Sequence, residues 1–203
     1  MNRKQQLFLA SQSPRRRELL EQMSIDYQVI SVDIDEQQHQ GELPAAYVTR
    51  VASEKAWAGW HAQSTVIKSP VLAADTSVVI GSQIMGKPVD ESDAFEMLRR
   101  LSDRTHEVYS AVALVDGETN VRISCSEVTF RLISDDEIRA YWQSGEPQDK
   151  AGGYAIQGLA ALFIDNLNGS YSGVMGLPLF ETAELLYDAG YNLLEQFKGS
   201  EKR

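Results

Sequence analysis

The chain has 203 residues, of which 43% are hydrophobic, so it can bury a core as one large domain or as two small lobes. Its 19 Lys and Arg residues stand against 29 Asp and Glu residues, and the formal net charge of -10 disfavours binding to nucleic acid or to an anionic membrane. No apolar run approaches the roughly 20 residues of a membrane span, and the one near the N-terminus is too short for a signal peptide. We expect the single cysteine, Cys125, to be a small core residue and the chain to work in the cytoplasm.

The N-terminal part of the chain predicts a β-α-β unit followed by a longer helix. The apolar run at residues 7–10 indicates a short buried strand, residues 15–23 a helix with one apolar face, and residues 27–31 a second strand. Residues 45–60 repeat apolar side chains at helical spacing. This spacing predicts a second helix.

A polar residue closes the next apolar run. Residues 71–74 predict a buried strand that ends at Asp75. A polar side chain at the end of a buried strand is a candidate site residue. Residues 77–80 and 84–85, separated by a turn that contains Gly81, predict a hairpin.

The remaining elements continue without a strict β-α-β rhythm. In chain order they are a helix at 92–101 capped by Ser92, paired strands at 107–115 and 121–130, a helix at 135–143 between Ser134 and Gly145, a charged glycine-rich loop at 145–153, a strand at 162–164, a loop at 169–178, a helix at 179–189 and a flexible tail at 198–203. We therefore expect an α/β fold in one domain over residues 1–203, with an elongated mixed sheet and two lobes around a central cleft. Such a cleft suits a nucleotide.

Hydroxyl and guanidinium groups crowd the junction between the first strand and the first helix, at residues 11–17. Ser13 suits the N-cap position and Pro14 the first helical position, so the free N–H groups of the helix start would face the same space as Arg15 and Arg16. Basic charge at a helix start opposes the helix dipole, and a bound phosphate would account for it. The alternative is a surface helix whose first turn happens to be basic.

Two acidic positions are candidates for metal binding and acid-base chemistry. Asp75 is ionised at neutral pH, which suits a metal ligand or a base that orients water. Glu36 belongs to an acidic pair after the second strand and is the candidate to share the metal. The alternative for Asp75 is an aspartate that forms a turn, and the alternative for Glu36 is a solvated acidic pair in a loop.

Further charged residues are candidates for holding an anionic ligand. Glu54 and Lys55 share the second helix, where one would face the cleft and the other support it. Lys87 precedes a proline, which favours an extended backbone, and Lys150 lies in the glycine-rich loop. For each of these residues the alternative is a solvated surface charge.

Gln157 follows the glycine-rich loop and is the candidate for recognising a base. Its amide carries both donor and acceptor groups, as does the N3–H and carbonyl edge of uracil and thymine. The alternative is a glutamine that bonds its own loop backbone.

Together these residues supply cations for phosphates, carboxylates for a divalent metal and a group that can deprotonate water, as phosphoryl chemistry on a triphosphate requires. No zinc-type spacing, phosphate-binding P-loop motif or dinucleotide fingerprint occurs. Two other classes stay open. A nucleotide-binding regulator of cell division would use the same cleft without turnover, and a phosphatase would release orthophosphate from the γ end.

The chain resembles the Maf family of nucleoside triphosphate pyrophosphatases over nearly its whole length. The matching motifs are Ser11–Arg16, Asp35-Glu36, Glu54-Lys55-Ala56, Ala74-Asp75-Thr76, Gly86-Lys87-Pro88, Thr105-His106, Glu146-Pro147, Asp149–Gly152, Ile156-Gln157-Gly158 and Gly169-Ser170-Tyr171. The resemblance implies hydrolysis of a nucleoside triphosphate to its monophosphate and pyrophosphate, with Mg²⁺ or Mn²⁺ as cofactor. It also implies the two-lobed fold of inosine triphosphate pyrophosphatases and a homodimer.

The resemblance also assigns roles. Asp75 matches the proton acceptor, while Arg15, Thr76 and Gln157 match positions that set base choice. The combination of Ala-Asp-Thr with Ile-Gln-Gly resembles the branch of the family that acts on dTTP and UTP. The metal would lie near Glu36 and Asp75. The substrate contacts are then Ser11, Ser13, Arg15, Arg16, Glu54, Lys55, Thr76, Lys87, Lys150 and Gln157. The chain departs from the family pattern at Asp103 and Ala160, where glycine is common.

Overall fold

The computed structural model describes residues 6–193 and contains one seven-stranded mixed sheet with helices on both faces. The strands lie in the order β2-β1-β3-β5-β6-β7, with β4 paired to β3. They are β1 (Leu7–Leu9), β2 (Tyr27–Val29), β3 (Val71–Ile80), β4 (Gln83–Met85), β5 (Thr105–Val115), β6 (Thr119–Phe130) and β7 (Ile164–Asn168). The predicted mixed α/β fold is confirmed.

Six α-helices and two short 3₁₀ helices accompany the sheet within residues 6–193. They are α1 (Pro14–Gln22), α2 (Pro44–Ala62), α3 (Glu91–Leu101), α4 (Asp135–Gln143), η1 (Ala151–Gly153), η2 (Leu159–Leu162), α5 (Tyr171–Met175) and α6 (Leu179–Asp188). No helix in this part of the chain is long and apolar enough to cross a membrane. The tail predicted at 198–203 lies outside the described residues.

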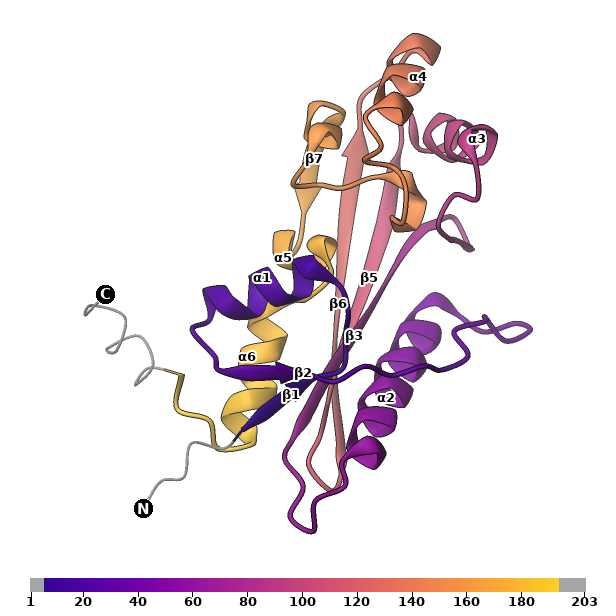
Figure 1. Ribbon diagram of the computed structural model, residues 1–203. Helices are drawn as coiled ribbons and strands as arrows, with labels where there is room; N and C mark the ends of the chain where they lie inside the picture. The colour runs from indigo at the N-terminus through magenta and orange to yellow at the C-terminus, as the bar shows by residue number, and fades with distance from the viewer. Residues whose placement is uncertain (1–5, 194–203) are drawn as a thin grey trace.

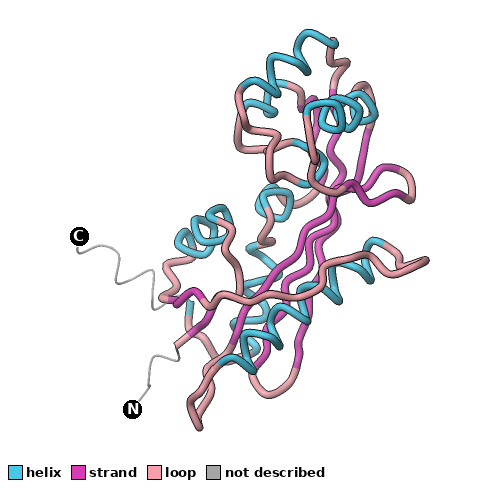
Figure 2. Tube along the Cα trace, turned by 45° about the vertical axis from the view of Figure 1, so that its right-hand side comes forward, coloured by secondary structure: helices cyan, strands magenta, loops and turns pink. Residues whose placement is uncertain are grey.

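The long strands β3, β5 and β6 extend through the whole molecule, as Figure 1 shows, with α2 along one face of the sheet and α6 on the other. Helices α3 and α4 lie at the opposite end from β1 and β2 in both views (Figures 1 and 2). Successive side chains of a strand point to opposite faces, so β3 serves two cores. Leu72 and Ala74 join the larger core, and Val71 and Ala73 join the one beneath α2.

One edge of the sheet has a notch along β3. Strand β1 pairs with β3 only as far as Leu72, and β4 begins to pair at Val78. Between them, residues 73–77 have β5 as their only neighbouring strand among residues 6–193. Since no strand covers this edge, the side chains of both faces of β3 reach one open space.

The prediction that the buried strand ends at Asp75 is wrong. The β3 ladder with β5 continues through Asp75, opposite Ala111, and Thr76, opposite Ser110, as far as Val79. Polar side chains are tolerated in the middle of this strand because they lie at the notch. The predicted hairpin is confirmed, since β4 pairs antiparallel with β3.

The expected strand at 162–164 is also wrong. Residues Leu159–Leu162 form η2, and the strand begins at Ile164. The loop expected at 169–178 contains the short helix α5, which Ser170 caps by accepting a hydrogen bond from the N–H of Gly173. Because glycine has a low helix propensity, the glycine-rich sequence of this segment does not predict the helix.

Two side-chain predictions are also corrected. Asp90, not Ser92, caps α3, and its Oδ1 accepts a hydrogen bond from the N–H of Asp93 at 2.8 Å. Cys125 is exposed and is not a core residue, because the alternation of β6 buries its neighbours Ser124 and Ser126 instead.

Other sequence-based predictions are confirmed. β5 pairs with β6 along its full length, from Thr105 opposite Thr129 to Val115 opposite Thr119. Ser134 caps α4 and forms a capping box with Glu137, and Gly145 follows the helix with a φ of 76°, a left-handed conformation that glycine adopts easily.

Candidate functional site

A cavity of about 1010 Å³ opens at the notch in β3. Its walls come from the start of α1, from α2, from β3 and from the two segments around Lys87 and Lys150. It brings together eleven of the residues proposed from the sequence: Ser11, Ser13, Arg15, Arg16, Glu36, Lys55, Asp75, Thr76, Lys87, Lys150 and Gln157. Segments distant in sequence therefore meet at one site.

A buried lysine joins two carboxylates on one side of the cavity. The Nζ atom of Lys55 lies 2.9 Å from Oδ1 of Asp75 and 2.9 Å from Oε2 of Glu36. Lys55 lies one helical turn after Val51, on the face of α2 that packs against the sheet, so its ammonium group reaches the notch. Lys55 is 9% exposed and Asp75 6% exposed, which excludes most of the water from the pair.

The electrostatics of Asp75 are set by two opposing effects. Burial raises the pKa of the carboxyl group, and the charges of Lys55 and Arg16 oppose that rise. The net result is a pKa above the ordinary value of an aspartate. A carboxylate with a raised pKa is a better proton acceptor.

Arg16 is held in place by neutral groups. Its Nε donates to the carbonyl oxygen of Gly176 at 2.8 Å, and its Nη1 donates to Oγ of Ser11 at 3.4 Å. Burial lowers the pKa of the guanidinium group, and the charge of Asp75 raises it. Since these contacts leave most of the charge without compensation, the group is oriented to receive an anion.

The start of α1 has the predicted arrangement. Ser13 occupies the N-cap position and Pro14 the first turn, but the Ser13 side chain makes no capping hydrogen bond. The backbone N–H of Ser13 instead donates to Oγ of Ser11 at 3.2 Å. The first N–H groups of the helix therefore have no side-chain cap, which suits anion binding at this end.

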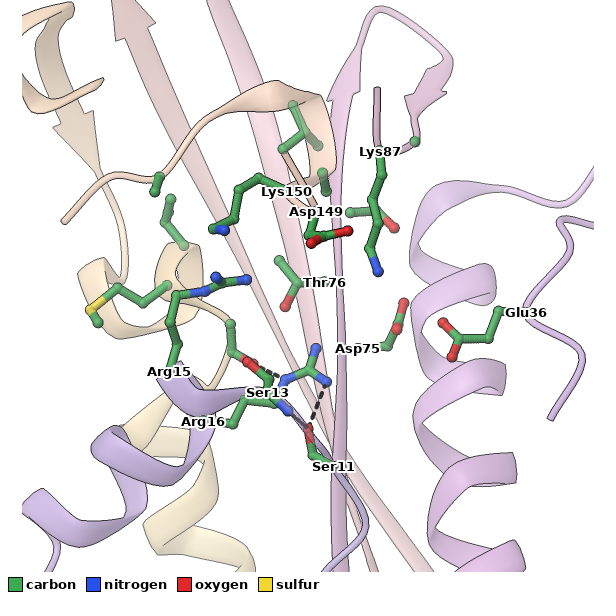
Figure 3. Close-up of a pocket in the computed structure, with 18 of the residues that line it drawn as sticks. Ser11, Ser13, Arg15, Arg16, Glu36, Asp75, Thr76, Lys87, Asp149 and Lys150 are labelled. Atoms are coloured by element: carbon green, nitrogen blue, oxygen red, sulfur yellow. Dashed lines mark hydrogen bonds between the residues drawn. The ribbon is translucent and has the colours of Figure 1, made fainter. Parts of the chain in front are cut away.

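Four cations surround the cavity. No carboxylate in residues 6–193 lies within 4.0 Å of Arg15, Arg16, Lys87 or Lys150. Figure 3 shows their side chains around the space between Asp75 and Thr76. Burial, followed by the charge of Arg15, lowers the pKa of Lys150. In a chain of net charge -10, this concentration of positive charge favours a polyanionic ligand.

Glu54 lies outside the cavity lining. Its Oε2 accepts a hydrogen bond from Nη1 of Arg50 at 3.1 Å on the exposed side of α2. Adjacent helix residues point about 100° apart, so the turn of α2 that directs Lys55 to the notch directs Glu54 to solvent.

Ser110 was missed by the sequence analysis. Its Oγ lies 2.7 Å from the hydroxyl of Thr76 and donates to the carbonyl oxygen of Gly173 at 2.6 Å. A polar residue in the middle of the apolar strand β5 is a usable signal, since a buried hydroxyl requires partners.

Gln157 lies at the cavity wall between η1 and η2, and its exposed side chain makes no hydrogen bond within the described residues.

The two departures from the family pattern have structural explanations. Asp103 has a φ of 56°, a left-handed conformation that aspartate tolerates better than most residues. The methyl group of Ala160 is fully buried in the core.

Two carboxylates could hold a divalent metal at this site. Within residues 6–193 no group of three or more His, Cys, Asp or Glu side chains could form a complete metal site. Asp75 and Glu36 nevertheless face one cavity and share Lys55. Mg²⁺ is often held by one or two carboxylates together with water and substrate phosphates, so this pair fits a metal that arrives with its substrate.

Comparison with known proteins agrees with the resemblance in motifs. The family model described as Maf-like protein matches residues 6–189. A protein of Aromatoleum aromaticum named dTTP/UTP pyrophosphatase is 51% identical over 202 residues, covering 92% of this chain and 97% of its own. A protein of the same name from Saccharophagus degradans is 53% identical over 182 residues, covering 89% of this chain and 87% of its own.

Among solved structures, the Staphylococcus aureus Ham1 protein aligns with a TM-score of 0.42 at 16% identity, covering 62% of this chain and 71% of that chain. The family match spans every element from β1 to α6 and all the cavity residues named above. This chain belongs to the Maf-like protein family.

Proposed function

We propose that this chain hydrolyses dTTP and UTP to the nucleoside monophosphate and pyrophosphate. The observation that carries the proposal is a set of four cations around the buried pair of Lys55 and Asp75, none of which has an ionic partner within the described residues. Such a site has charge for a triphosphate and a carboxylate for deprotonating water. The names of the relatives support the choice of substrate.

The cations hold the triphosphate. Arg15, Arg16 and the start of α1 approach the cavity from one side, and Lys87 and Lys150 approach it from the other. Arginine offers a planar fork to phosphate oxygens, and lysine offers a point charge. Together they stabilise the negative charge that develops on the leaving pyrophosphate.

Asp75 accepts a proton from the attacking water. The water oxygen forms a bond to the α-phosphorus, the bond from that phosphorus to the bridging oxygen breaks, and pyrophosphate leaves with the electron pair. The pKa of Asp75, raised by burial, makes the carboxylate a stronger base than one in water. Lys55 keeps the carboxylate oriented through their 2.9 Å contact.

Asp75 and Glu36 would hold the divalent cation. When bound, Mg²⁺ or Mn²⁺ supplies positive charge that polarises phosphate oxygens. Removal of the metal by EDTA should abolish pyrophosphate release, and restoring Mg²⁺ should recover it.

Gln157, Thr76 and Arg15 are proposed to set the choice of base. An amide with its donor and acceptor both free can pair with the N3–H and carbonyl edge of uracil and thymine.

We also propose that the chain acts as a homodimer in the cytoplasm. Light scattering of the purified protein tests the dimer.

The experiment is incubation of the purified chain with UTP or dTTP and Mg²⁺, with separate assays for pyrophosphate and orthophosphate. Pyrophosphate in a 1:1 ratio with the monophosphate is the expected result. Orthophosphate alone would indicate a phosphatase that acts on the γ end. Nucleotide binding without either product would indicate a regulator, and both outcomes would contradict the proposal.

A further inference from the structure

The carboxylate of Glu146 bonds a segment of chain that lies after Gln157. Oε2 accepts a hydrogen bond from the backbone N–H of Leu159 at 2.8 Å, and Oε1 accepts one from the N–H of Ala160 at 3.2 Å. Hydrogen bonds to a charged acceptor are stronger than neutral ones. Glu146 thus ties the start of η2 to the loop that follows α4.

Tyr141 extends these contacts to the other side of Gln157. Its hydroxyl donates to Oε1 of Glu146 at 2.8 Å and accepts from the backbone N–H of Ala155 at 3.3 Å. The tyrosine is 4% exposed, and its ring packs edge-on against Phe163. The Glu146 and Tyr141 pair therefore bonds the chain both before and after Gln157.

Gly158 shows how closely the carboxylate approaches. A Cβ atom at this position would overlap the carboxylate of Glu146. The φ of Gly158 is -110°, which any residue can adopt, so its backbone conformation does not require glycine. The space that a side chain would need is filled by the carboxylate.

Between these fixed points, Gln157 depends on its backbone for position. Its side chain has no hydrogen-bond partner within the described residues, and it lies at the cavity wall. An amide that recognises a base must be held within a fraction of an ångström of its productive position. The N–H of Gly158 donates to the carbonyl oxygen of Ala155 at 3.0 Å, and Ile156 is buried in the core, so the turn itself is ordered. Glu146 and Tyr141 add the side-chain hydrogen bonds that hold both ends of this turn.

We infer that Glu146 and Tyr141 are positioning residues that fix Gln157 for recognition of the pyrimidine base. The inference rests on the proposed function, because it concerns the base that the same cavity receives. Neither residue is among those that line the cavity, so we place both behind the residues that face the nucleotide. Their effect on base choice passes through the backbone of residues 155–160.

The test compares UTP with CTP, which share the sugar, the triphosphate and the ring size and differ in the base edge. Glu146→Gln keeps the size of the side chain but places an amide N–H₂ against backbone N–H groups. Tyr141→Phe removes the hydroxyl and keeps the ring. We expect each change to lower the UTP-to-CTP ratio of kcat/KM by about tenfold, mainly through a higher KM for UTP, since a charged hydrogen bond is lost or weakened.

Two matched variants serve as controls. Tyr27 donates its hydroxyl to Glu21 at 3.0 Å, which is the same type of contact, and neither residue lines the cavity. Glu21→Gln and Tyr27→Phe should leave both kcat/KM values within about twofold of the original chain. Thermal unfolding of all variants checks that they fold.

A double-variant cycle distinguishes positioning from a purely structural role. In a Gln157→Ala background, Glu146→Gln should change the UTP-to-CTP ratio by less than about twofold, because the side chain through which it acts is gone. Additive losses, or an unchanged ratio in the folded single variants, would overturn the inference. If the original chain releases no pyrophosphate, the proposed function fails, and affinities for UTP and CTP measured by calorimetry then test the positioning role alone.

Discussion

The hydroxyls of Thr76 and Ser110 lie 2.7 Å apart, and one arrangement of their protons satisfies both. Ser110 donates its single proton to the carbonyl oxygen of Gly173 at 2.6 Å. Thr76 must then donate to Ser110, since a hydroxyl has one proton. Thr76 therefore presents only lone pairs to the cavity and acts there as a hydrogen-bond acceptor.

In the Ser110→Ala variant, the Thr76 hydroxyl should no longer be restricted to the role of hydrogen-bond acceptor in the cavity. The hydroxyl of Thr76 becomes free to rotate, and the carbonyl of Gly173 loses one of its two donors but keeps the N–H of Gly176, so the cost in stability is about 1 kcal/mol. We expect kcat/KM for UTP to fall by about tenfold. Steady-state kinetics and urea unfolding measure the two effects separately.

Ser126→Ala is the matched control for this change. Ser126 is a buried strand serine that accepts a hydrogen bond from the N–H of Ser170 at 2.9 Å and does not line the cavity. It should lose comparable stability while kcat/KM stays near that of the original chain. Equal losses of kcat/KM in both variants would refute the acceptor role assigned to the Thr76 hydroxyl.

Replacement of Asp75 by asparagine removes the proton acceptor and keeps the size of the side chain. Loss of a general base lowers a rate by roughly 10² to 10⁴, so kcat for UTP should fall by that factor. Nucleotide affinity should change little, because the cations remain. Single-turnover kinetics with a separate binding assay test this, and an unchanged kcat would exclude the role given to Asp75.

Lys55→Met should shift the pH dependence of hydrolysis toward higher pH. Burial raises the pKa of Asp75 and Lys55 opposes the rise, so removing the lysine raises that pKa further. Because the reaction needs the deprotonated carboxylate, the acidic limb of the kcat/KM profile should move upward. Lys68→Met, which removes an ammonium group bonded to the carbonyl of Trp60, is the control and should leave the limb in place.

His106 makes the stability of the fold depend on pH. The ring is 2% exposed, its Nε2 lies 2.8 Å from the hydroxyl of Tyr154, and its Nδ1 has no hydrogen-bond partner in the part of the chain that the structure describes. Burial lowers the pKa of His106 to about 4 from 6.5. The unfolded chain therefore binds a proton at His106 more readily than the folded chain does. The contribution of the neutral ring to the free energy of unfolding is complete above pH 6.5 and is lost as the pH falls toward 4.

Urea unfolding at pH 7.5 and pH 4.5 measures this effect. The linked free energy amounts to about 3 kcal/mol over the full range between the two pKa values. His106→Leu should show a smaller drop in unfolding free energy between the two pH values than the original chain. Equal drops would contradict the assignment.

Local sequence patterns were sufficient for most of the fold. The α2 helix, the β5–β6 pair and the N-cap at Ser134 follow from periodicity and side-chain chemistry within a short window. Patterns failed where a distant segment determines the conformation. The β3 strand continues through Asp75 because β5 pairs with it there, and no local signal in residues 71–80 reports that partner.

The site followed the same division. Residue chemistry and the family resemblance predicted Arg16, Lys55, Asp75 and Gln157 as candidate site residues, and the structure brings them to one cavity. The distinction between Lys55 and Glu54 required the rotation of α2 relative to the notch. The place of Ser110 within a strand marks it as a residue that needs a hydrogen-bond partner, but the sequence does not show that this partner is Thr76, 34 residues away.

The notch in the sheet also bears on aggregation. An uncovered strand edge can pair with a strand of another molecule, which is a common route to insoluble aggregates. Here β1 and β4 close both ends of the opening, and only residues 73–77 remain uncovered. The positive charges of Arg16 and Lys87 stand at this edge and would repel the matching edge of a second copy. The molecule therefore keeps an open strand edge for a small ligand while discouraging the approach of another chain.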